Sequence, residues 1–520
     1  MHTLSSYMCG EWHVGEGAPT FLLDAATGEP VAELRQGGLD RGAALAYARS
    51  VGGPALRALT FAQRGEMLGA LAKVIHAHRD ELLDLSRING GTTRGDGKFD
   101  VDGASGTLSY YAYLGKKLGD ATVLLDGDEE SLMRSKRFVG QHVLTSRRGA
   151  AIHINAFNFP AWGLAEKAAV AWLAGVPVFA KPGTATSLLT HRVVQLWVEA
   201  GVLPEGALSL LVGSAGDLLD HAGPQDCVAF TGGSATAAKI RGHEALIRHN
   251  VRVNIEADSL NAAVLGPDVT PGSDTFQMVV NLVSRDLTQK CGQKCTAVRR
   301  IMVPEAHAAD LIEALVERLD GVTVGDPGTR GVEIGPASSK AQQRSVEEGL
   351  AALSDAATCV WQGDLPAGAP EGACFVRPSL FRADRGLETP FVHEHEVFGP
   401  VATILPYDGS ADAAVDLVAA GGGGLVASVY SDDATWGGDV AFGIAPYSGR
   451  VHWGSVKIHD QSPGPGTVLP NFVHGGPGKA GGGEELGGQR GLGFYMQRTA
   501  IQADRGLLKR ALKGRVAGVD

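Results

Sequence analysis

The sequence has 520 residues, of which 44% are hydrophobic and 20% are charged. This composition is typical of a globular protein with a sizeable core, and it excludes a disordered chain, a coiled coil and a disulfide scaffold. The formal charge of −11 gives no overall attraction for nucleic acid or for anionic membranes.

The N-terminus and the apolar segments predict a cytoplasmic protein. Residues 1–10 lack the basic and apolar regions of a signal peptide. The longest apolar stretch, Ala168–Ala180, is too short to cross a bilayer. The six cysteines fit reduced thiols in a cytosol.

The first half of the chain predicts a parallel sheet. Arg57–Ile88 has a helical pattern, and Ser131–Ser146 predicts two polar edge strands. After residue 148, apolar runs alternate with amphipathic segments, which is typical of a parallel sheet covered on both faces. The predicted strands are Ala150–Asn155, Val176–Ala180, Leu208–Val212, Val228–Phe230 and Val251–Ile255, and the predicted helices are Ala161–Ala174, Ser187–Ala200 and Ala235–Leu246.

The ends of these strands carry most of the candidate site residues. Asn155–Pro160, Lys181–Thr184, Thr231–Ser234 and Glu256 each come directly after a predicted strand. Parallel sheets bind their ligands at the carboxyl ends of the strands. A loop explains any one of these segments, but the coincidence of four favours a site.

The second half predicts another α/β unit, with helices at Asp310–Leu319 and Ser339–Leu353. The glycine-rich tract Gly464–Gly493 predicts an irregular loop. It contains a match to the dinucleotide fingerprint at Gly476–Gly481. We reject this match because no strand is predicted before it and more glycines follow where a helix would begin.

Cys295, in Lys290-Cys-Gly-Gln-Lys-Cys-Thr296, is the candidate nucleophile. Most free cysteines are buried and inert. A zinc site is disfavoured because no second Cys/His pair lies nearby. The polar neighbours and Lys294 favour a thiolate. On the residues alone, the structural and the nucleophilic interpretations both stay open.

Three residues at the predicted sheet edge also have two interpretations. Glu256 could be a solvated strand end or a general base. Asn158 could be a turn residue or could donate its amide N–H to a developing oxyanion. Lys181 could be a solvated cation or could bind phosphate or ribose oxygens.

Taken in order, these segments resemble the aldehyde dehydrogenase superfamily over almost the whole chain. Each motif is weakly specific, but their shared order is strong evidence. The matching segments are Tyr7–Trp12, Asp24–Glu29, Asn158-Phe-Pro160, Lys181-Pro182, Phe230-Thr-Gly232, Glu256, Gly292-Gln-Lys-Cys295 and Glu394–Val401.

The resemblance implies an α/β fold with a Rossmann-type cofactor domain, a second α/β catalytic domain and a small β oligomerisation arm. The expected boundaries are 1–128 and 147–257 for the cofactor domain, 258–465 for the catalytic domain, and 129–146 and 488–510 for oligomerisation. We therefore expect a homodimer or homotetramer.

The resemblance also implies the catalytic roles. Cys295 matches the nucleophile that adds to the aldehyde carbon. Asn158 and the backbone N–H of Cys295 match the oxyanion hole. Glu256 matches the base that activates water, and its presence favours a free acid over an acyl-CoA product. No metal is expected.

The same comparison implies the cofactor residues. Lys181 and Glu396 match residues that hold the two riboses, and Phe398 matches the residue against the nicotinamide. The family's NAD-preferring members usually have Glu where this chain has Thr184, so room for a 2′-phosphate favours NADP over NAD. The backbone that approaches the pyrophosphate corresponds to Thr231, Gly232 and Gly233.

Departures from the family pattern indicate a divergent branch. Ala156-Phe157 replaces Pro-Trp, Ala257–Ser259 replaces Gly-Gly-Lys, and the tail Gly478–Gly487 is less aromatic. This combination resembles the branch that oxidises CoA-linked semialdehydes after aerobic opening of the ring of benzoyl-CoA or phenylacetyl-CoA. No hydratase domain follows before Asp520, which favours the benzoate type.

Other functions stay open. These are the oxidation of free aliphatic or aromatic aldehydes, a thiol hydrolase or acyltransferase, and a non-catalytic protein of the same fold. The hydrolase is disfavoured because no His or Asp is arranged beside Cys295 by motif. Four cations are candidates for binding coenzyme A, although a surface position suits each better: Lys294, Arg299, Arg300 and Lys457.

Overall fold

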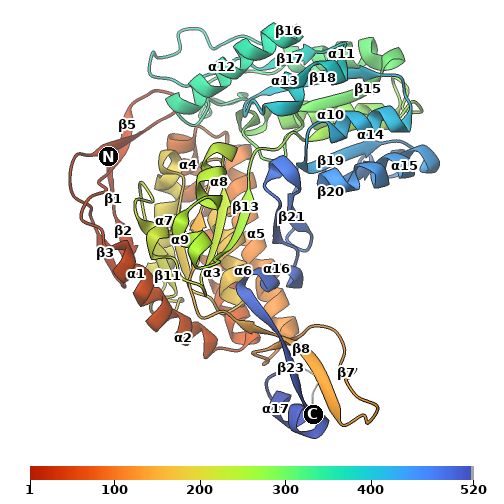
Figure 1. Ribbon diagram of the computed structural model, residues 1–520. Coiled ribbons are helices and arrows are strands. Elements are labelled where there is room, and N and C mark those ends of the chain that lie inside the picture. Colours follow the sequence, from red (N-terminus) through yellow and green to blue (C-terminus); the bar gives the residue numbers. More distant parts are fainter. Residues whose placement is uncertain (517–520) are drawn as a thin grey trace.

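The computed structural model describes residues 1–516 and contains two seven-stranded sheets covered by helices (Figure 1). The first sheet has five parallel strands, extended by two antiparallel strands from the N-terminus. In order across the sheet, the strands are β13 (Arg252–Glu256), β12 (Cys227–Thr231), β9 (Ala151–Ile154), β10 (Val178–Lys181), β11 (Leu208–Leu210), β2 (Ser6–Met8) and β3 (Glu11–His13).

Both faces of the parallel part of this sheet are covered, which explains why its central strands β9, β10 and β12 are mostly apolar. One face shares a core with α3 (Phe61–Ala77), α4 (Arg79–Gly90), α5 (Arg94–Leu118), α6 (Trp162–Leu173) and α7 (Ser187–Glu199). The other face packs on α1 (Arg41–Tyr47), α8 (Ser234–Arg241) and α9 (Glu244–Arg248). The predicted α/β class is confirmed.

Helix α6 is apolar on all sides, and every residue in it except Gly163 is buried. Its two charged residues, Glu166 and Lys167, are therefore carried into the interior. Burial of charged groups is costly unless they are paired, so these side chains require partners from other elements.

The second sheet is parallel except for its first pair of strands. Its order is β16 (Thr358–Gln362), β17 (Ser379–Arg382), β18 (Val401–Tyr407), β15 (Arg300–Pro304), β14 (Ala262–Leu265), β19 (Gly424–Tyr430) and β20 (Ser448–Gly454). One face packs on α10 (Asp274–Thr288) and α11 (Glu305–Asp320), and the other on α12 (Lys340–Ala356), α13 (Pro390–Glu394), α14 (Ala411–Ala419) and α15 (Ala434–Ile444).

A separate antiparallel sheet extends away from the two main sheets, at the bottom of Figure 1. It pairs β23 (Met496–Asp504) with β8 (Phe138–Ser146), beside the short strands β6 (Leu124–Leu125) and β7 (Glu130–Ser131). The two strands predicted within 131–146 thus correspond to the end of β7 and to β8. Within residues 1–516, no helix has both the length and the apolar character needed to cross a membrane.

Two local predictions are wrong. The single helix predicted at 235–246 is two helices, α8 and α9, because Gly242 ends the first and His243 is extended. The tract predicted as a loop contains a hairpin, β21 (Val473–Gly476) and β22 (Gly483–Leu486), followed by α16 (Gln489–Tyr495).

The glycines of this hairpin permit close contact between backbones. A Cβ atom on Gly475 would lie 2.1 Å from the Gly483 carbonyl oxygen, and one on Gly476 would lie 2.2 Å from that of Gly424. A strand therefore does precede Gly476. It leads into a hairpin rather than a helix, so the fingerprint at Gly476–Gly481 still lacks the required context.

Candidate active site

The carboxyl ends of neighbouring strands bring the predicted polar residues to one edge of the first sheet. Lys181, Thr231 and Glu256 are the last residues of β10, β12 and β13. Thr231 is paired directly with Glu256 in the register of the two strands. Asn158 lies in the segment that follows β9, the strand between β10 and β12.

Cys295 reaches this edge from the second unit. It follows α10 through a turn in which Lys290, Cys291 and Gly292 all have positive φ, at 55°, 55° and 64°. A Cβ on Gly292 would lie 2.1 Å from the carbonyl oxygen of Gly399, so the turn requires glycine there. This strained turn presents the half-buried Cys295 to the first sheet.

Asn158, Glu256 and Cys295 line the same small cavity. The Asn158 Nδ2 atom donates a hydrogen bond to the Gln293 carbonyl at 3.1 Å, which leaves its second N–H available. The backbone N–H of Cys295 has no acceptor within residues 1–516. Two donors therefore remain to bind an oxygen that becomes negatively charged beside the sulfur.

His474 joins this group, which no local motif indicated. Its Nε2 atom lies 3.8 Å from Cys295 Sγ and 3.2 Å from Glu256 Oε2. The ring is fully buried and packs edge-to-face on Trp162, with centroids 5.7 Å apart. The sequence shows no histidine beside Cys295 by motif, and the structure places one there.

The hairpin explains how His474 reaches the site. Strand β21 contacts β13 of the first sheet and β19 and β20 of the second, so it lies where the two sheets meet (Figure 1). The side chain is separated from Cys295 by 179 residues, and only tertiary packing brings them together.

The charges around the sulfur oppose thiolate formation at rest. Burial, and then the nearby Glu256 carboxylate, raise the pKa of Cys295 well above its usual value. The expectation that Lys294 stabilises a thiolate is wrong, because its Nζ atom is paired with Asp286 at 2.7 Å. Burial also opposes ionisation of Glu256, but His474 and Lys167 outweigh it and lower the pKa of this carboxyl to about 2.

The buried charges of α6 find their partners behind Glu256. Lys167 Nζ lies 2.6 Å from Glu166 Oε1 and 2.9 Å from Glu485 Oε2. Asn254 donates to the other oxygen of Glu485 at 3.0 Å. Carboxylate oxygens of Glu166, Glu256 and Glu485 lie within 4.8 Å of one another, so Lys167 balances a concentration of negative charge.

A cavity of about 580 Å³ leads to Cys295. It is partly aromatic, with Phe99, Phe159 and Trp162 in its wall, and α5 contributes much of one side. This volume lies within the range typical of sites for small organic molecules.

The model of the aldehyde dehydrogenase family matches residues 15–501. The chain belongs to this family. It is 47% identical, over 91% of its length and 93% of the relative's, to a 3,4-dehydroadipyl-CoA semialdehyde dehydrogenase of Aromatoleum evansii. It is 28% identical, over 92% of its length and 90% of the relative's, to a hydroxyisobutyraldehyde dehydrogenase of Mycolicibacterium austroafricanum.

A solved structure supports the same fold. An aldehyde dehydrogenase from Bacillus cereus, in complex with NAD⁺, superposes with a TM-score of 0.83 at 23% identity, covering 97% of both chains. The predicted resemblance to this family, and to its branch with CoA-linked semialdehydes, is confirmed. The protein is thus an NAD(P)-dependent oxidoreductase.

The predicted cofactor residues fit such a ligand at the sheet edge. Within residues 1–516 the Lys181 ammonium has no hydrogen bond or ion pair, and burial lowers its pKa to about 8. The Thr231 hydroxyl is also buried and has no partner among the described residues. Thr184 donates to the Gly213 carbonyl at 3.3 Å. A bound dinucleotide would supply phosphate and ribose oxygens as partners for these groups.

Glu396 and Phe398 belong to the second unit, in the connection between α13 and β18. The Glu396 carboxylate accepts from Arg299 Nε at 3.1 Å and from the Ser259 backbone N–H at 2.8 Å. Burial raises the pKa of this carboxyl to about 7. Phe398 packs edge-to-face on Phe157, with centroids 5.9 Å apart. Their roles toward ribose and nicotinamide stay predictions.

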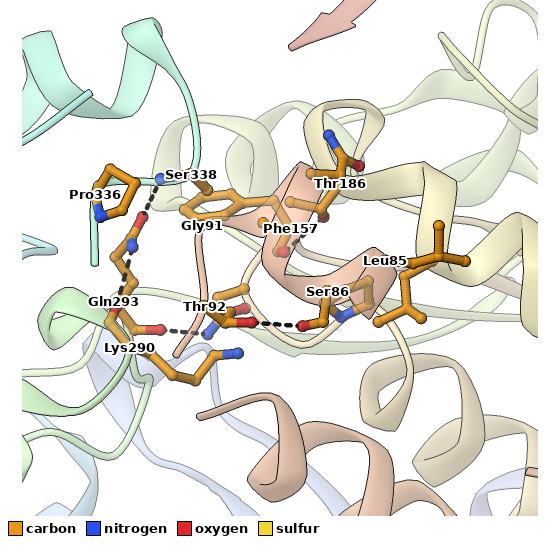
Figure 2. A pocket seen from close by; sticks show the side chains of 15 residues that line it. Leu85, Ser86, Gly91, Thr92, Phe157, Thr186, Lys290, Gln293, Pro336 and Ser338 are labelled. Carbon is orange, nitrogen blue, oxygen red and sulfur yellow. Dashed lines mark hydrogen bonds between the residues drawn. The ribbon is translucent and has the colours of Figure 1, made fainter. Parts of the chain in front are cut away.

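Gln293 lies in the loop that carries Cys295, and its side chain ties this loop to neighbouring segments. Figure 2 shows its hydrogen bonds in the adjoining pocket. Its side-chain amide donates to the Lys290 carbonyl at 3.0 Å and accepts from the Ser338 backbone N–H at 3.1 Å. Since its own carbonyl accepts from Asn158, Gln293 connects the Cys295 loop to the segment that carries Asn158.

Three of the four cations considered for coenzyme A are not on the surface. Lys294, Arg299 and Arg300 are all buried. Lys294 and Arg299 are held by carboxylates, and Arg300 donates to backbone carbonyls, including that of Leu417 at 2.8 Å. These groups hold the fold together and have no free donor surface for a ligand. Only Lys457 is exposed, as expected.

Proposed function

We propose that this protein oxidises a CoA-linked semialdehyde to the carboxylic acid, with NADP as the cofactor. The observation that carries the reaction is the convergence of Cys295, Asn158 and Glu256 on one cavity. The substrate class is supported by 47% identity to a 3,4-dehydroadipyl-CoA semialdehyde dehydrogenase, which makes that semialdehyde the first candidate.

In the state whose His474 imidazole is neutral, the reaction begins with proton transfer from the Cys295 thiol to His474 Nε2, 3.8 Å away. The ionised Glu256 carboxylate, 3.2 Å from the same nitrogen, stabilises the imidazolium that forms. The thiolate adds to the aldehyde carbon, and the resulting alkoxide is bound by Asn158 and by the backbone N–H of Cys295.

The bound nicotinamide supplies the hydride acceptor. The enzyme is then left as a thioester on Cys295, which must be hydrolysed. Glu256 takes a proton from water as the oxygen attacks the thioester carbon. The C–S bond then breaks, the sulfur regains its proton from the His474 imidazolium, and the carboxylic acid leaves. The low pKa of Glu256 and the adjacent Lys167 keep this base ionised near neutral pH.

NADP is favoured over NAD by Thr184. A carboxylate here would repel a 2′-phosphate, whereas threonine is neutral and Lys181 supplies positive charge from the same strand end. We expect Thr184→Glu to shift the ratio of kcat/KM toward NAD. A wild type that prefers NAD contradicts this choice.

The decisive experiment tests purified protein against CoA-linked semialdehydes and matched free aldehydes with both cofactors. We expect reduction of NADP, a higher kcat/KM with the CoA-linked substrates, and a free acid product. If only the free aldehydes are oxidised, the protein is instead a dehydrogenase of free aliphatic or aromatic aldehydes. An acyl-CoA product that requires added coenzyme A contradicts hydrolysis by Glu256.

We also propose that β8 and β23 pair subunits, in a homodimer or homotetramer in the cytoplasm. Support comes from the exposure of β23, in which six consecutive positions after Met496 are exposed. Light scattering measures the mass of the assembly, and deletion of residues 497–510 is expected to give monomers. An unchanged mass contradicts this role.

A further inference from the structure

A second cavity lies beside the substrate cavity and has no role in the chemistry described above. Its volume is about 500 Å³. Gly95, in the first turn of α5, and Gln289, directly after α10, line both cavities. The two spaces therefore adjoin, and a long ligand could extend from Cys295 through the first into the second.

The second cavity is rich in arginine, in a chain with a net charge of −11. Arg94 begins α5, Arg285 lies in the last turn of α10, and Arg330 lies in the connection from α11 to α12. All three are exposed. Three separate elements therefore place guanidinium groups around one space.

These guanidinium groups are largely available to a ligand. Arg94 pairs with the exposed Asp80, an interaction that solvent weakens. Arg285 donates from Nη2 to the Pro463 carbonyl at 2.7 Å. Arg330 has no ion pair or side-chain hydrogen bond within residues 1–516.

The acidic groups of the same cavity are engaged elsewhere. Asp96 is buried and accepts from the Thr93 hydroxyl at 2.8 Å, and burial raises the pKa of its carboxyl. Glu333 is exposed and pairs with Arg318 at 3.4 Å, an interaction that solvent also weakens, so Glu333 offsets part of the charge of the three arginines. The N-terminus of the 25-residue helix α5 adds further positive potential. The balance of the cavity is positive, which suits an anion.

We propose that Arg94, Arg285 and Arg330 bind the phosphate groups of a CoA thioester whose aldehyde end lies at Cys295. This inference rests on the proposed function. Guanidinium groups bind phosphate oxygens in a bidentate manner, and coenzyme A carries a diphosphate and a 3′-phosphate at the end opposite its sulfur. The flexible pantetheine arm joins that end to the acyl chain, and the partly aromatic first cavity accommodates the arm and chain.

The test compares a CoA-linked aldehyde with a free aldehyde of the same chain. In Arg285→Ala/Arg330→Ala we expect KM for the CoA-linked substrate to rise about tenfold or more, because each charge-assisted hydrogen bond contributes strongly. The kinetics of the free aldehyde should change less than about twofold, since the residues at Cys295 are untouched. The matched lysine variant, Arg285→Lys/Arg330→Lys, should keep part of the affinity.

Arg344→Ala is the control, because Arg344 is exposed on α12 and lines neither cavity. Calorimetry then measures the direct binding of three ligands: free coenzyme A, coenzyme A without its 3′-phosphate, and inorganic phosphate. Binding of coenzyme A that is lost in the alanine variant supports the site. If inorganic phosphate binds as tightly as coenzyme A, the cavity is a simple anion site and the assignment is overturned.

The two proposals fail in different ways. If the wild type oxidises the CoA-linked aldehyde and the alanine variant does so with unchanged KM, the arginine site is wrong and the function stands. An equal loss with both substrates also overturns the site, because the arginines then make no distinction between the CoA-linked and the free aldehyde. If the wild type does not oxidise the CoA-linked aldehyde at all, the proposed function itself is wrong.

Discussion

The Nε2 atom of His474 lies 3.8 Å from Cys295 Sγ. The same nitrogen lies 3.2 Å from Glu256 Oε2, so the imidazole contacts both the proposed nucleophile and the carboxylate proposed to activate water. A protonated thiol in a buried site requires a base, because burial disfavours the free thiolate. This arrangement explains how a cysteine with a raised pKa can react near neutral pH.

Replacement of His474 by Gln should move thiolate formation to higher pH. The variant loses the proton acceptor, so the midpoint of Cys295 alkylation by iodoacetamide against pH should rise by about one unit or more. The acid limb of kcat/KM should shift in the same direction. His459→Gln is the control, since His459 is exposed. Identical alkylation profiles for wild type and H474Q would remove His474 from the mechanism.

Asn158→Ala tests the oxyanion pocket separately from the nucleophile. Loss of one such donor is expected to lower kcat by about 100- to 1000-fold. Alkylation of Cys295 by iodoacetamide forms no oxyanion, so its rate should stay within a few-fold of wild type. Because Asn158 also donates to the Gln293 carbonyl, Asn158→Ser, which keeps one donor, is a useful second variant. Equal losses in oxidation and alkylation would indicate a displaced loop instead.

The affinity for NADP should fall as pH rises above about 8. Burial lowers the pKa of Lys181 to about 8, so the free enzyme loses this positive charge at higher pH. A bound phosphate favours the charged lysine, and binding then requires uptake of a proton, which weakens affinity by up to about tenfold per pH unit. Calorimetry across this range measures the effect. Lys181→Met should bind weakly at every pH, and a flat profile in the wild type would contradict the assignment.

Lys167→Met should destabilise the fold. The variant leaves Glu166 and Glu485 buried without their cation, which typically costs about 3–5 kcal/mol in the free energy of unfolding. Burial raises the pKa of Glu166, and a carboxyl whose pKa is raised in the folded state loses stability as pH increases. The defect should therefore be smaller at mildly acidic pH than at neutral pH.

Denaturant titration at both pH values measures this difference. Lys73→Met, at an exposed position of α3, is the control and should change the free energy of unfolding by less than about 0.5 kcal/mol. A loss in Lys167→Met that is the same at both pH values would show that uncompensated carboxylates are not its cause.

The periodicity of the sequence was sufficient to predict which residues lie at the carboxyl edge of the first sheet. Apolar strands alternating with helices imply parallel strands, and parallel strands place the residues after them together. Lys181, Thr231 and Glu256 are therefore found where they were expected, at the ends of β10, β12 and β13. Asn158 and Cys295 lie in short motifs of consecutive residues, which can be recognised in the sequence itself.

The remaining site residues depend on contacts that no local pattern encodes. His474 lies in a glycine-rich tract that predicted a loop, and it reaches Cys295 only because β21 packs between the two sheets. Likewise Arg94, Arg285 and Arg330 surround one cavity from three distant segments. Periodicity reports which face of an element is buried, but not which element covers it. Close packing between whole elements decided those neighbours.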